Sequence, residues 1–181
     1  LERFKDTFGY YPKRVCADSG YGSITNYRFL KNNNIENYVK YNMWSKDVSG
    51  ENVDCFRFDD NHNLICLNNK IAKEKSEYQG RHSRNKSNKF YIINNCKRCK
   101  YKKLCFKPIK NKKAQERIFE TSEEMYLYKK TARENLLTIK GIEMRVNRSS
   151  QVEGAFGVIK QDMNYERIRR RGIEKVSAEI M

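Results

Sequence analysis

Six cysteines are the residues of this chain whose type and spacing most directly point to chemistry. Cys96, Cys99 and Cys105 form a C-x2-C-x5-C pattern, and Cys66 lies upstream as a fourth thiol. A C-x2-C loop turns two thiolates toward one point, and four such ligands hold a structural zinc ion. Three interpretations stay open for these thiols: a zinc site, reduced thiols without a metal, and an iron–sulfur cluster. We expect the other two cysteines to be core residues.

Basic residues dominate the charge of the chain. Its 181 residues include 38 Lys and Arg against 22 Asp and Glu, a formal net charge of +16. Residues 81–113 contain basic and aromatic side chains but no Asp or Glu. This charge favours a polyanionic partner, DNA or RNA, although a solvated lysine surface is the alternative. The residues that we expect to contact DNA from the two basic clusters are Lys97, Arg98, Lys102, Lys103, Arg169, Arg170 and Arg171.

The first elements of the chain predict a β-α-β unit. Residues 14–18 are typical of a short buried strand that ends at Asp18, before a Ser-Gly-Tyr-Gly turn. A helix is expected to begin near Ser23 or Thr25, and residues 35–41 should return as a strand parallel to the first. Asp18 would then lie at the carboxyl end of a strand, where open α/β sheets bind ligands.

The rest of the chain predicts an insertion followed by helices. Short extended segments between polar loops indicate a β-rich insertion. The capping box Thr121-Ser-Glu-Glu124 predicts a long helix that ends at Gly141, and a last helix should begin near Ser149 or Ser150. Its core stripe would be Val152, Phe156, Ile159 and Met163. The predicted parts are a core segment at 1–43, the insertion at 44–120 and a helical return at 121–181.

Two local sequences place carboxylates in distinctive surroundings: ADSGYG, which contains Asp18, and NRSSQVEGAFGVIK, which contains Glu153. Through these sequences, the cysteine segment and the RRRG tail, the chain resembles the DDE transposases of bacterial insertion sequences. Glu153 and Lys160 have the E-(6)-K spacing of the family's Y-(2)-R-(3)-E-(6)-K signature. The match is imperfect further upstream, because Ser149 occupies the Arg position and Arg148 lies one residue before it.

The resemblance implies a ribonuclease H-like fold, a mixed sheet flanked by helices, here interrupted by the β-rich insertion. In that family three carboxylates hold two Mg²⁺ ions, which activate water and then a 3′-hydroxyl for attack on a phosphodiester. Asp18 matches the second carboxylate and Glu153 the third. Mg²⁺ prefers oxygen ligands, and a metal pair stabilises both the attacking and the leaving oxygen. Lys160 and Arg148 are the expected phosphate contacts on the same helix.

Each carboxylate also has a local interpretation. Ser150-Gln-Val-Glu153 fits a capping box in which Glu153 binds its own helix terminus, and Asp18 fits a turn or cap residue. The family's first carboxylate lies on a strand well upstream of Asp18, and Asp6 is too close to occupy that position. We therefore expect the carboxyl-terminal portion of a catalytic domain, incomplete at its N-terminus, that neither transposes nor nicks DNA alone.

Two classes of function remain in competition. The first is a DDE transposase or a remnant of one, homo-oligomeric in the full-length protein and active on insertion-sequence ends and target DNA. The second is a non-catalytic basic DNA-binding module with a structural zinc site. RNA binding has no support from paired RNP-type aromatic strands. The sequence contains no run of about 18 apolar residues, so we expect no membrane insertion and a cytoplasmic, nucleoid-associated protein.

Overall fold

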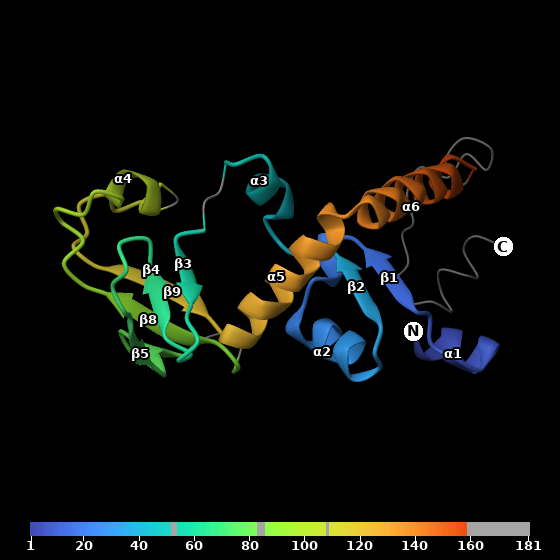
Figure 1. Cartoon of the computed structure of the whole chain (residues 1–181), viewed down its shortest axis with the longest axis horizontal. Helices are drawn as coiled ribbons and strands as arrows, with labels where there is room; N and C mark the ends of the chain where they lie inside the picture. The colour runs from blue at the N-terminus through green and yellow to red at the C-terminus, as the bar shows by residue number, and fades with distance from the viewer. Residues whose placement is uncertain (52–53, 83–85, 108, 159–181) are drawn as a thin grey trace. The chain divides into compact units, whose positions relative to one another are not determined.

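The computed structural model describes residues 1–51, 54–82, 86–107 and 109–158, and within them the chain is α/β, as predicted (Figure 1). It divides into two units, Leu1–Asn135 and Leu136–Met181, and each is described by itself. None of the helices in the described ranges is long and apolar enough to cross a bilayer. The predicted three-part boundaries stay a prediction.

The first segment of the chain is the predicted β-α-β unit. Its elements are α1 (Glu2–Phe8), β1 (Arg14–Ala17), the 3-10 turn η1 (Ser19–Tyr21), α2 (Ile24–Asn32), β2 (Glu36–Val39) and α3 (Trp44–Val48). β1 and β2 pair in parallel, with Ala17 opposite Val39. The Ser23 hydroxyl caps α2 by accepting the Asn26 N–H at 3.2 Å. α2 then buries Ile24, Tyr27 and Leu30.

A β-rich segment follows, as predicted. Its elements are β3 (Phe56–Phe58), β4 (Leu64–Cys66), β5 (Lys73–Lys75), β6 (Glu77–Tyr78), β7 (Arg81–His82), β8 (Lys89–Ile93), α4 (Lys102–Cys105) and β9 (Arg117–Thr121). β8 pairs antiparallel with β5 on one side and β9 on the other, and these strands lie side by side in Figure 1. β3 and β4 form a separate antiparallel pair, as do β6 and β7. Leu64, Tyr91, Ile93, Phe106 and Phe119 form the apolar part of its core.

The predicted boundaries of the last two helices are wrong. α5 (Glu123–Leu137) is capped by Ser122, whose Oγ accepts the Met125 N–H at 3.2 Å, rather than by Thr121. α5 ends before Gly141, which lies inside α6 (Ile139–Gly157). The Thr138 hydroxyl accepts the Gly141 N–H at 3.0 Å. Thr138 therefore caps a new helix, α6, within the range where one helix was expected to continue to Gly141.

The predicted helix start at Ser149 or Ser150 is also wrong, because both residues lie within α6. Their hydroxyls bond locally: Ser149 donates to Glu153 Oε1 at 3.0 Å, and Ser150 donates to the Val146 carbonyl at 3.3 Å. Such local bonds let serine occupy a helix interior as well as a cap. Of the predicted core stripe, Val152 is exposed, and the side chains of the other three residues lie outside the described part.

Candidate functional site

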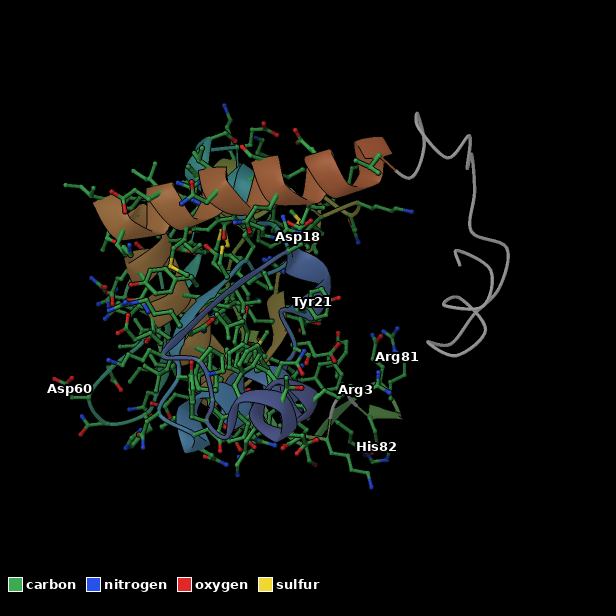
Figure 2. The ribbon with its side chains drawn as sticks, turned by 90° about the vertical axis from the view of Figure 1, so that its right-hand side faces the viewer. Arg3, Asp18, Tyr21, Asp60, Arg81 and His82 are labelled. Carbon is green, nitrogen blue, oxygen red and sulfur yellow. The ribbon has the colours of Figure 1, made fainter. Side chains whose placement is uncertain are left out.

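Asp18 follows directly after β1 and precedes η1, so it lies at the carboxyl end of the strand, as predicted (Figure 2). Its side chain is 52% exposed, and its Oδ1 lies 3.5 Å from the Lys40 ammonium. Although Asp18 occupies the cap position of η1, it makes no side-chain cap hydrogen bond to that turn. The cap interpretation of Asp18 is therefore not supported, and the carboxylate faces solvent beside a cation.

The cation beside Asp18 is Lys40, which the sequence did not single out. It comes directly after β2, and its N–H donates to the Ala17 carbonyl at 3.0 Å, which extends the pairing of the two strands. Parallel neighbouring strands end at the same edge of a sheet, so the residues after β1 and β2 lie side by side. That rule, applied to the predicted strand at 35–41, is the signal that could have identified Lys40.

Gly22 allows the turn after Asp18 to lie against the end of β2. A Cβ at this position would be 2.6 Å from the Lys40 carbonyl oxygen, 3.0 Å from the Tyr27 hydroxyl and 3.0 Å from the Tyr41 Cα. A Cβ at Gly20, two residues earlier, would have no other atom within 4 Å. The second glycine of the ADSGYG sequence is thus required by close packing, and this packing fixes the backbone that carries Asp18.

Glu153 lies on α6 with an exposed side chain, and its Oε1 accepts the Ser149 hydroxyl hydrogen bond. Because α6 begins at Ile139, Glu153 is far from the helix N-terminus, and the capping-box interpretation of this residue is wrong. Arg148 is half-buried on the same helix. Asp18 belongs to the first unit and Glu153 to the second. The predicted DNA contacts Lys160, Arg169, Arg170 and Arg171 lie outside the described residues.

The basic side chains predicted in the β-rich segment differ in exposure. Lys97, Arg98 and Lys103 are exposed. Lys102 is half-buried, because its ammonium donates to the Ala114 carbonyl at 3.0 Å and lies 5.3 Å from the centre of the Phe106 ring. Lys102 therefore holds the loop after α4 in place, whereas the other three are available to a ligand.

The four cysteines singled out by the sequence, Cys66, Cys96, Cys99 and Cys105, line one cavity of about 20 Å³. No group of three or more His, Cys, Asp or Glu side chains in the described ranges is arranged to hold a metal ion. Of the two expected core cysteines, one is buried (Cys55) and the other, Cys16 in β1, is half-buried.

Cys55 has a role that the sequence analysis did not find. Its thiol is hydrogen-bonded to Cys105, which raises the pKa of Cys55. The same bond lowers the pKa of the Cys105 thiol, and the nearby Arg117 guanidinium adds to this effect. Burial raises the pKa of Cys96. The Cys55–Cys105 contact thus shifts the pKa values of the two thiols in opposite directions.

Residues 65–181, more than half of the chain, match the family model described as "Transposase DDE domain". The chain belongs to this family. Comparison with curated proteins and with solved structures finds no match. Membership implies a transposase-type function, with DNA as the partner and a divalent metal ion as the cofactor.

Proposed function

We propose that this chain contributes Asp18 and Glu153 to the active site of a DDE transposase that cuts and joins the DNA ends of an insertion sequence. The observation that carries the proposal is the setting of Asp18, a half-exposed carboxylate at the carboxyl end of β1 that its own turn does not use as a cap. The family match at residues 65–181 includes Glu153 and not Asp18, so the role of Asp18 as a metal ligand is argued from this setting and from the ADSGYG sequence around it.

The donor set fits Mg²⁺, because carboxylate oxygens are the ligands that hard divalent cations prefer. When bound, a pair of such ions activates the attacking hydroxyl and stabilises the leaving oxygen of a phosphodiester. Asp18 is held toward solvent by the packing of Gly22, and Lys40 supplies a positive charge next to it. We assign Lys40 to orienting the Asp18 carboxylate and attracting the DNA phosphate. The parallel β1–β2 pair would belong to a ribonuclease H-like sheet that brings Asp18 to Glu153.

DNA would be held by basic side chains on both parts of the chain. Lys97, Arg98 and Lys103 are exposed, so each can contact a phosphate at little desolvation cost. Lys102 would act indirectly, through the loop that it holds. Around Glu153 the proposed contacts are Arg148, Lys160, Arg169, Arg170 and Arg171. The same proposal includes assembly of the full-length protein into a homo-oligomer on DNA, in the nucleoid.

Iron-directed cleavage of the polypeptide tests the metal ligands. Fe²⁺ replaces Mg²⁺ in oxygen-ligand sites and, with ascorbate and peroxide, cuts the polypeptide next to the bound ion. Applied to the full chain with a DNA duplex, it should give cuts next to Asp18 and Glu153. Asp18→Asn should abolish both sets of cuts, because the two residues share the ions.

The matched control is Asp60→Asn, which removes an exposed carboxylate away from β1. This variant should keep the wild-type cutting pattern. Cuts that persist at both positions in Asp18→Asn, or no cuts at either position in the wild type, would refute the assignment of these carboxylates.

A further inference from the structure

Cys66, Cys96, Cys99 and Cys105 line one small cavity, although their thiols are not already arranged as a metal site in the described part of the chain. The cavity volume of about 20 Å³ is room for about one water-sized sphere. Cys66 ends β4, Cys96 and Cys99 lie in the turn after β8, and Cys105 ends α4. Cysteines from three separate parts of the segment therefore line one small space, and they are the same four that the sequence grouped as a possible zinc site.

Tight turns follow two of these cysteines. The Cys99 N–H donates to the Cys96 carbonyl at 3.3 Å, which folds the C-x2-C loop back on itself. Past β4, the Asn69 N–H donates to the Cys66 carbonyl at 2.9 Å, with Asn69 in the left-handed region at φ 56°. Both turns fix the backbone next to a cysteine that lines the cavity.

The core of the β-rich segment is small and rich in thiols. Its described cluster has nine buried residues, and four of them are cysteines: Cys55, Cys66, Cys96 and Cys105. Small cores bury too little apolar area to be stable alone, and structural metals commonly supply the difference. A zinc ion at the centre of this cluster would link β4, the turn after β8 and α4.

The charge around the cavity suits a metal held by thiolates. Four thiolates and one Zn²⁺ ion carry a net charge of −2, which burial would disfavour without nearby cations. Lys102 and Arg117 both line the cavity, and no Asp or Glu does so within the described residues. Arg117 is fixed there, because its Nε donates to the Cys105 carbonyl at 3.2 Å and its guanidinium lies 4.3 Å from the centre of the Phe119 ring.

We propose that Cys66, Cys96, Cys99 and Cys105 bind one structural Zn²⁺ ion. Binding draws the four sulfurs inward to zinc–sulfur distances of about 2.3 Å. The Cys96 thiol, which donates to the Ile93 carbonyl at 3.4 Å, gives up that weak bond together with its proton. The site uses neither of the proposed catalytic carboxylates, so it stands or falls independently of the catalytic proposal.

Metal content is the direct test. The full chain, produced with zinc and purified under reducing conditions, should contain about one zinc ion per chain by mass spectrometry. Cobalt titrated into the chelated protein should give the absorption bands of a tetrahedral ion with four thiolate ligands. Zinc-free or disulfide-bonded protein that is folded, or iron in place of zinc, would overturn the proposal.

Serine variants identify the ligands. Cys105→Ser and Cys66→Ser should lose the bound zinc. The matched control is Cys16→Ser, in β1, which should bind zinc like the wild type. Equal loss in the control would overturn the site, as would full binding in Cys105→Ser. If a ligand variant fails to fold, the cobalt spectrum of the wild-type chain still decides between four thiolates and fewer.

Discussion

The Asp18 end of β1 and the cysteine cluster are built in opposite ways. Asp18 is half-exposed, and its position comes from the backbone packing of Gly22 on β2, within one β-α-β segment. Three of the four cysteines that line the cavity are buried, and they come from elements distant in the sequence. The two regions should therefore respond differently to substitution. Changing the Asp18 side chain should leave the fold intact, whereas changing a thiol of the cluster should destabilise it.

The largest expected effect is loss of stability when zinc is removed. Chelation should lower the free energy of unfolding by at least about 4 kcal/mol, because loss of a structural metal is among the largest single perturbations known. Urea unfolding followed by circular dichroism, with and without chelator, measures this difference. Asp18→Asn is the matched comparison and should unfold like the wild type. Identical unfolding curves with and without chelator would contradict a stabilising metal in the cysteine cluster.

The next effect concerns the packing under Asp18. Gly22→Ala places a methyl group against the Lys40 carbonyl and should destabilise the chain by about 1–3 kcal/mol, because backbone atoms must shift. Gly20→Ala, with open space around its Cβ, should change stability by less than about 0.5 kcal/mol. Urea midpoints of the two variants give the answer. Equal stability of both would show that the turn does not depend on this contact.

DNA affinity should respond to the exposed cations of the β-rich segment. Replacing Lys97 and Arg98 with Glu should reduce the slope of log binding constant against log salt by about 2, because each lost phosphate contact contributes about 0.9. Replacing Lys13 and Lys46, which are also exposed, makes the same charge change elsewhere. Fluorescence anisotropy at several salt concentrations measures both slopes. A similar change in the two double variants would mean that only net charge matters.

The smallest effect is a pH dependence at the start of α5. His62 Nδ1 lies 2.8 Å from Glu123 Oε1, and this contact raises the pKa of His62. A group whose pKa is raised by folding stabilises the fold fully at pH values below its unfolded pKa. That stabilisation is lost as the pH rises through the folded pKa. NMR titration should give a lower His62 pKa in Glu123→Gln than in Glu134→Gln, a change further along α5; equal values would contradict the contact.

Local signals were sufficient to predict the β-α-β unit. A capping serine at 23, apolar residues on one helix face and alternating apolar residues in the strand that follows all agree with the fold that forms. The same kind of signal failed at α5 and α6. Gly141 was interpreted as a stop and Ser150 as a start, but Thr138 provides the break, and the serine hydroxyls bond within the helix. A glycine or serine has several stable positions in helices, so its type alone does not fix a boundary.

Tertiary neighbours were harder to predict than elements. The spacing of Cys96 and Cys99 indicated one site, but the hydrogen bond of Cys55 to Cys105 joins residues far apart in the sequence and has no local signature. The pairing of Asp18 with Lys40 was accessible, because it follows from two predicted parallel strands that end at one edge. The sequence singles out candidate residues by type and spacing, and the packing of the chain determines which of them meet.

The central claim is that Asp18 and Glu153 share divalent metal ions, and a double-mutant cycle of Mn²⁺ binding tests it most directly. Free Mn²⁺ is measured by electron paramagnetic resonance for the full chain, Asp18→Asn, Glu153→Gln and the double variant, with Glu143→Gln on the same helix as control. We predict that each single variant weakens binding, that the control does not, and that the two losses couple by at least about 1 kcal/mol. Strictly additive losses, or unchanged binding in either single variant, would contradict a shared site.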